Sequence, residues 1–304
     1  MRRIRSWLLA GAVLAGTAGP PPAAASELKV VVTIKPLHAL VTRVMQGAGT
    51  PELLVKGTAS PHAFALKPSQ MRLLNEADIF FRMSEAVEPF TAKVVRSLPA
   101  GVEVVTMQEA EGVKLLARRT GATFERHQHG EAVDGHAWLD PDNAVAMTAR
   151  IARALSARAP ALAPIFRANA AALARDIADL AADLERDLAG VAGRPYIVFH
   201  DAFQYLERRY GLAPVGSIHV SPDVPPSGKR LAELRRKLTS LGAICVFAEP
   251  QSDPRLLANL VEGTGARLGT LDAEGVGLEP GPDLYFTLMR RLAGELKGCL
   301  APPA

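Results

Sequence analysis

Three histidines lie in loops that adjoin short apolar segments of the sequence. His62 lies in "SPHAFAL" after the apolar segment "ELLVK", His136 lies in "GHAWLDP" before a helix start, and His200 follows the apolar segment "YIVF". Loops at the carboxyl ends of parallel strands are where α/β sheets place their ligands. Three imidazoles and one oxygen make a tetrahedral site that suits Zn²⁺, whereas manganese, magnesium and calcium prefer oxygen ligands. The pattern therefore predicts a metal centre, with zinc as the preferred ion.

The fourth ligand of this predicted centre has two candidates. Asp272 ends "RLGTLD" and occupies the same kind of position after an apolar segment. A water molecule is the alternative. A single histidine at a strand end is more often structural than a metal ligand, so the prediction depends on the three histidines meeting in space.

Two further histidines, His127 and His129, lie in the polar stretch "ERHQHGE" just before His136. Histidine-rich tracts bind metal ions, so the pair is a candidate secondary metal site. The tract is short, which favours a solvated loop with incidental histidines.

The elements that must position these residues alternate between apolar segments and helices. Strands are expected at 28–34, 52–56, 78–83 and 102–107, and again at 196–199, 212–218, 243–248 and 266–271. Helices are expected between them, including one through 86–98 and a last one through 283–298. This alternation predicts an α/β fold with two similar lobes, each built on a mainly parallel sheet, and a metal site in the cleft between them.

One long helix interrupts the alternation. Residues 162–188 are rich in alanine and leucine at helical spacing, contain no glycine, and end at "AGVAGRP". A helix of about 25 residues is roughly 38 Å long. We expect it to join the lobes as a rigid connection that permits modest lobe motion. The predicted organisation is an N-terminal lobe at 26–158, the connecting helix at 159–190 and a C-terminal lobe at 191–304.

Residues 1–25 predict a signal peptide and therefore export to the periplasm. Three arginines precede an apolar run, and small residues end at Ala25. Removing these arginines lowers the basic count from 35 to 32 against 31 acidic residues, so the charge falls from +4 to +1. A nearly balanced charge does not favour a nucleic-acid partner.

The chain contains two cysteines, Cys245 and Cys299. In an exported protein they favour a disulfide over two free thiols. Closing a loop of about 55 residues corresponds to an upper stabilisation of roughly 4 kcal/mol in the chain-entropy estimate.

Taken in order, these segments resemble a known family, the zinc-binding periplasmic receptors of bacterial ABC importers (cluster A-I). The resemblance covers the chain after the leader and rests on "PHAFALKPSQ", "HAWLDP", "YIVFHDAFQYLERRYGL", "ICVFAEPQ" and "GTLD". It implies that the metal ligands are His62, His136 and His200, and that the second lobe contains the Cys245–Cys299 disulfide. Manganese-binding relatives carry a glutamate at the position of His200, so histidine there implies zinc.

Two positions depart from the pattern of the family. Some zinc-binding members have an acidic residue before the first histidine, where this chain has Pro61, and Gln70 replaces the usual aspartate after "KPS". These departures leave the choice between Asp272 and water open.

The resemblance implies a monomeric receptor without enzymatic activity that hands Zn²⁺ to a membrane permease. A manganese or iron receptor on the same scaffold is one alternative, and a surface adhesion protein is another. A zinc hydrolase is the alternative from a different class, because three histidines and a water also form a catalytic site. Glu249 is the nearest candidate for the general base of a hydrolase, although its position favours a structural role. The chain has no H-E-x-x-H, C-x-x-C, G-x-S-x-G or glycine-rich phosphate loop.

Overall fold

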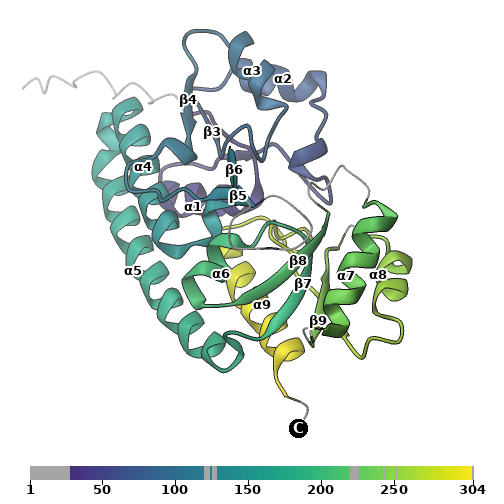
Figure 1. Cartoon of the computed structure of the whole chain (residues 1–304). Helices are drawn as coiled ribbons and strands as arrows, with labels where there is room; N and C mark the ends of the chain where they lie inside the picture. The colour runs from purple at the N-terminus through teal and green to yellow at the C-terminus, as the bar shows by residue number, and fades with distance from the viewer. Residues whose placement is uncertain are drawn as a thin grey trace, which may run out of the picture.

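Two four-stranded sheets, each with all strands parallel, organise the protein (Figure 1). The computed structural model describes residues 28–119, 124, 129–219, 226–240, 242, 244–250 and 252–302. The predicted signal peptide and His127 lie outside these residues. The predicted α/β class with mainly parallel sheets is confirmed.

The first sheet has the strand order β2-β1-β3-β4. Its strands are β1 (Val30–Val32), β2 (Glu52–Leu53), β3 (Ile79–Arg82) and β4 (Glu103–Thr106). The accompanying helices are α1 (Lys35–Met45), the 3-10 turn η1 (Pro61–Ala63), α2 (Pro68–Asn75), α3 (Thr91–Ser97) and η2 (Met107–Glu109). The helix expected at 86–98 begins only at Thr91, because the Glu88 carboxylate accepts the amides of Met83 and Ser84 and ties the preceding residues into a turn.

Both faces of this sheet are buried, and the side chains of β1 alternate between them. Val30 and Val32 point into the main core, whereas Val31 packs in a smaller cluster with residues of α2 and α3 such as Leu74 and Val94. Residues that alternate along a strand face opposite sides of its sheet. The uninterrupted run of valines therefore fits a strand buried between two layers.

The second sheet has the order β10-β9-β7-β8. Its strands are β7 (Pro195–His200), β8 (Ala213–His219), β9 (Cys245–Ala248) and β10 (Arg267–Thr270), and its helices are α6 (Gln204–Tyr210), α7 (Gly228–Ser240) and α8 (Pro254–Val261). Helices α7 and α8 lie together beside this sheet in Figure 1 and bury one of its faces, with Ile197 and Phe199 directed toward them. Tyr196 and Val198, on the opposite face, belong to the main core.

The long helix is confirmed as α5 (Ala163–Leu188), which has 26 residues. It runs beside α4 (Pro141–Arg158) in Figure 1 and also packs against α1 and the last helix, α9 (Leu284–Leu300). The remaining short turns are η3 (Ala137–Leu139), η4 (Pro160–Leu162) and η5 (Ala189–Val191). Because α5 contacts helices from both halves of the chain, the main core continues from one sheet to the other. The two predicted lobes, the first half of the chain at 26–158 and the second half at 191–304, therefore share this core.

An antiparallel hairpin, β5 (Ala117–Arg119) with β6 (His129–Val133), was not expected from the sequence. The expectation of a polar loop is therefore wrong at the backbone of His129, which begins β6. Side chains of the second half hold the hairpin: Gln204 Nε2 donates to the carbonyl of Ala117 at 3.1 Å, and the Arg119 guanidinium bonds Asp201 and Glu207. These contacts come from residues more than 80 positions away, which no local pattern predicts.

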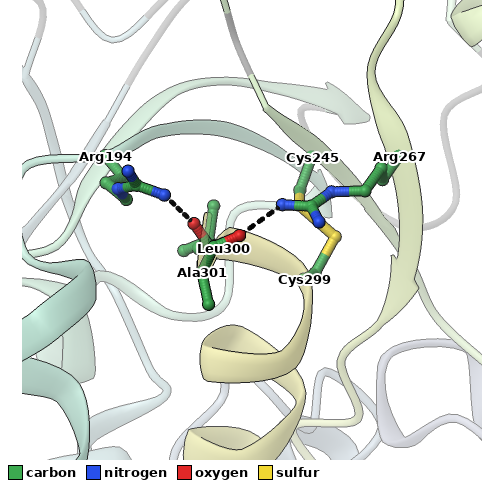
Figure 2. The surroundings of a disulfide bond; sticks show 6 residues. All are labelled: Arg194, Cys245, Arg267, Cys299, Leu300 and Ala301. Carbon is green, nitrogen blue, oxygen red and sulfur yellow. Dashed lines mark hydrogen bonds between the residues drawn. A yellow bond between two sulfur atoms is a disulfide. The ribbon is translucent and has the colours of Figure 1, made fainter. Parts of the chain in front are cut away.

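The predicted disulfide is confirmed between Cys245, which begins β9, and Cys299, in the last turn of α9. Figure 2 shows two arginines directed at the end of the same helix: Arg194 donates to the carbonyl of Leu300, and Arg267 donates to that of Ala301 at 2.7 Å. The last carbonyls of a helix lack partners within it. The arginines and the disulfide thus fix the carboxyl end of α9 to the second sheet.

Candidate metal centre

The side chains of His62, His136 and His200 come from different parts of the fold and lie close together. His62 lies in the single turn η1, where Ser60 caps the turn by accepting the amide of His62 at 3.3 Å. His200 is the last residue of β7, as expected for a ligand at the carboxyl end of a parallel strand. His136 differs from that expectation, because the strand before it is β6 of the antiparallel hairpin.

The nitrogen atoms that face one another have the spacing of a zinc site. The Nε2 atom of His136 lies 3.3 Å from Nε2 of His62 and 3.4 Å from Nε2 of His200. All three ligand atoms lie within 4.8 Å of one another. A tetrahedral zinc ion with Zn–N bonds of 2.0–2.1 Å requires nitrogen separations of about 3.3–3.4 Å. The two short separations therefore match two edges of such a tetrahedron.

Two carboxylates orient two of the rings. The Nδ1 atom of His136 donates to Asp134 Oδ1 at 2.8 Å, and the His136 amide donates to the same oxygen at 3.0 Å. The Nδ1 atom of His200 donates to Glu249 Oε1. A carboxylate that accepts the Nδ1 proton fixes the tautomer in which the Nε2 lone pair is available and raises the basicity of the ring.

The sequence did not assign these carboxylates to the histidines. Asp134 precedes His136 by two positions, and Glu249 directly follows strand β9. The position of Glu249 at the carboxyl end of a parallel strand was the available signal. Its ionic hydrogen bond to His200 agrees with the structural role that its position favoured.

Burial sets the protonation of the cluster. The pKa of His62 is lowered to about 2, by burial first and then by the neighbouring His136 and His200. Burial, followed by the charge of His200, lowers the pKa of His136 to about 3. Burial also opposes the charge on His200, but the charge and hydrogen bond of Glu249, together with the charges of Glu274 and Asp201, outweigh it and raise the pKa of His200. Two rings are thus held neutral, which is the form that binds metal.

Asp272 lies near the end of β10 and is buried, but its carboxylate has backbone partners. Asp272 Oδ1 accepts the amides of Glu274 at 3.0 Å and Gly275 at 2.9 Å. In the part of the chain that the structure describes, the group able to hold a metal comprises the three histidines without Asp272. Burial, and then the nearby Glu249, raises the pKa of Glu274 to about 8.

Trp138 packs beside the histidines. Its side chain is fully buried, and its ring centroid lies 5.2 Å from that of His136. The indole Nε1 donates to the carbonyl of Ala273 at 3.0 Å, and Tyr285 donates to the carbonyl of Trp138 at 2.9 Å. The indole is therefore placed to report a charge bound at His136.

Among the residues described, the helices are either too short or too polar to span a bilayer.

Comparison with known proteins shows the family to which this chain belongs. A family model described as the periplasmic component A of the zinc-uptake complex matches residues 30–299. The chain belongs to this family. Among its relatives, the high-affinity zinc uptake system protein ZnuA of Brucella suis biovar 1 is 39% identical over 334 aligned positions, which cover 99% of this chain and 100% of the relative.

Solved structures share the fold of this zinc-uptake component. The crystal structure of Zn(II)-bound AdcA from Streptococcus pneumoniae superposes with a TM-score of 0.73 at 25% identity, covering 92% of this chain and 59% of that longer chain. A crystal structure of ZnuA superposes with a TM-score of 0.77 at 22% identity, covering 91% of this chain and 100% of that chain. The second likeness supports the fold alone.

Proposed function

We propose that this protein is a periplasmic receptor that binds Zn²⁺ through the Nε2 atoms of His62, His136 and His200 and delivers it to the permease of an ABC importer. The observation that carries the proposal is the pair of Nε2 separations, 3.3 and 3.4 Å, centred on His136. Membership of the zinc-uptake family supports the choice of ion and the periplasmic location. The signal peptide at 1–25 and a monomeric state are parts of the same proposal.

Residues around the site orient two of its histidine rings before a cation binds. Asp134 and Glu249 hold two rings with Nε2 directed inward, so little reorientation is needed on binding. The two carboxylates also place negative charge next to the rings, which offsets part of the charge of Zn²⁺ in a buried site. His200, whose pKa is raised, is the ring that must release a proton when zinc binds.

We propose water as the fourth ligand, in preference to Asp272. Two amides of its own loop hold the carboxylate of Asp272, and turning this carboxylate toward zinc would break both hydrogen bonds. A weak secondary metal site at His127 and His129 is a separate proposal, which the two histidines of this short polar tract support.

We propose that the protein is a receptor and not a hydrolase. A carboxylate free to act as general base on the bound water would favour a hydrolase. Glu249, the candidate from the sequence, bonds the ring of His200. This use supports a role in orienting a ligand.

X-ray absorption at the zinc edge of the loaded protein tests the site directly. We expect three imidazole nitrogens and one oxygen at about 2.0–2.1 Å. In the His62→Ala variant we expect one imidazole fewer, and in His38→Asn, a control histidine whose ring bonds the carbonyl of Pro51 at 3.0 Å, an unchanged spectrum. A wild-type spectrum with fewer than three imidazoles would contradict the proposal.

A further inference from the structure

A buried lysine of the first helix bonds a loop of the second half of the chain. Lys35, the first residue of α1, is 7% exposed. Its Nζ donates to the carbonyls of Gly275 at 3.0 Å, Val276 at 2.8 Å and Leu278 at 3.1 Å. An ammonium group has three N–H donors, so these contacts use all of them. The partners are 240 or more positions away in sequence.

The loop that Lys35 bonds, residues 272–278, is also held at its other end. Trp138 donates to the carbonyl of Ala273, and Asp272 accepts two amides within the loop. Gly275 has φ +72°, a conformation that glycine adopts without strain. The loop therefore has one defined shape, and side chains from the first half of the chain, Lys35 and Trp138, bind its carbonyls at both ends.

The same loop lies next to residues that adjoin two of the proposed ligands, one from each half of the chain. Glu274 and Val276 line a cavity of about 10 Å³ together with Lys35 and Pro61, the residue before His62. A cavity of this size holds about one water. The loop continues from β10, which pairs with β9, and β9 leads to Glu249 and its bond to His200. The loop thus connects the side of the site that supplies His62 with the side that supplies His200.

We infer that Lys35 is a positioning residue, a latch that holds loop 272–278 on α1 and so fixes the distance between the ligands of the two halves. This inference rests on the proposed zinc-binding function. Separating the halves requires three charge-assisted hydrogen bonds to break, and such bonds are stronger than neutral ones. Lys35 therefore slows the release of zinc while leaving its capture largely unchanged, since changes within one binding site act mainly on dissociation rates.

The test compares Lys35→Met with the wild type and with Lys29→Met, which removes an exposed lysine that pairs with Glu76 at 3.3 Å. Zinc is loaded on the mature protein, and its release to an excess of chelating indicator is followed by stopped flow. We expect release from Lys35→Met to be about tenfold faster, within the range typical of coupling between parts of a protein. Association is expected to stay within about twofold of the wild type, and Lys29→Met to behave as the wild type.

Hydrogen exchange of the metal-free proteins supplies a second readout that does not involve zinc. In Lys35→Met we expect faster exchange at the amides of loop 272–278, such as Leu278, which bonds the carbonyl of Gly275 at 3.0 Å. Lys35→Gln keeps a donor on a shorter side chain and should give an intermediate release rate. This variant also provides the test if Lys35→Met does not fold.

The outcomes separate the latch from the function on which it rests. If the wild type does not bind zinc tightly, the proposed function fails. If the wild type binds zinc, and Lys35→Met and Lys35→Gln release it at the wild-type rate, the latch is contradicted and the proposed function stands. A lower melting temperature with an unchanged release rate would likewise overturn the latch, because it would show a role in folding alone.

Discussion

His136 and Asp134 form a chelate-like pair in which one carboxylate oxygen accepts both the ring Nδ1, at 2.8 Å, and the backbone amide, at 3.0 Å, of the same histidine. The carbonyl of Asp134 accepts the hydroxyl of Tyr205 at 2.7 Å, so the second half of the chain holds this pair in place. The ring that stands between His62 and His200 is therefore fixed by residues from both halves of the chain.

This pair predicts the effect of two substitutions at Asp134. We expect Asp134→Ala to weaken zinc binding by about 10–100-fold, because loss of an outer carboxylate frees the ring and lowers its basicity. Asp134→Asn keeps a hydrogen-bond acceptor and should lose less affinity. Chelator competition measures both, with Asp142→Asn, at an exposed position, as the control. Equal losses in the two Asp134 variants would mean that orientation of the ring is unimportant.

The pH dependence of zinc affinity is expected to follow His200. Its pKa is raised above the ordinary 6.5, so protons compete with zinc first at this ring as the pH falls. His62 and His136 stay neutral until about pH 2–3 and do not contribute in this range. Zinc affinity should therefore fall as the pH drops through the raised pKa of His200.

In Glu249→Gln the charge that raises this pKa is removed, so the fall should begin at a lower pH. Titration calorimetry in buffers of different ionisation enthalpy measures both the affinity and the protons released. An identical pH profile in the two proteins would count against the assignment of Glu249.

The stability of the metal-free protein is expected to depend on His62 in acid. The pKa of this ring is near 6.5 in the unfolded chain and about 2 in the folded one, so the unfolded state takes up the proton first. Stability contributed by the neutral ring is present above pH 6.5 and is lost progressively as the pH falls toward about 2. Denaturant midpoints should therefore fall more steeply with acid in the wild type than in His62→Gln. Parallel curves for the two proteins would contradict the depressed pKa.

The disulfide is expected to stabilise the fold without changing the zinc affinity of the site. Cys245 begins β9, whereas Glu249 follows the other end of that strand. The double variant Cys245→Ser, Cys299→Ser should lose up to about 4 kcal/mol of unfolding free energy. Its zinc affinity at 25 °C should remain within about twofold of the wild type. Loss of a carboxylate that orients a metal ligand, by contrast, is expected to cost about 10–100-fold in affinity. A large loss of affinity in the folded double variant would show that the end of α9 and the site are coupled.

The sequence predicts the two sheets and the long helix because each depends on local periodicity. The valines of β1 and the stripe of α5 that includes Leu173, Ile177 and Leu184 are examples. The position of His200 was also predictable, because α/β sheets place their ligands after the carboxyl ends of parallel strands. The position of His136 was not, because the strand before it belongs to an antiparallel hairpin.

The remaining features depend on partners distant in the sequence. The hairpin that precedes His136 contains Arg119, which pairs with Asp201 and Glu207, residues of the second half. In the sequence, Lys35 is an ordinary residue at the start of a helix. Only the structure shows that it bonds the carbonyls of Gly275, Val276 and Leu278. Such contacts carry no local sequence signal, which is why the latch and the hairpin emerge only from the structure.

The most direct test of the three-histidine zinc site is a competition titration of the metal-free mature protein with Zn²⁺ and Mn²⁺ against a chelating indicator, with the fluorescence of Trp138 recorded in parallel. We expect one tight zinc equivalent, weak manganese binding and a fluorescence change that saturates at the same ratio. His200→Ala should bind zinc at least 100-fold more weakly, and His38→Asn should match the wild type. Tight zinc binding that is indifferent to His200→Ala would contradict the three-histidine site.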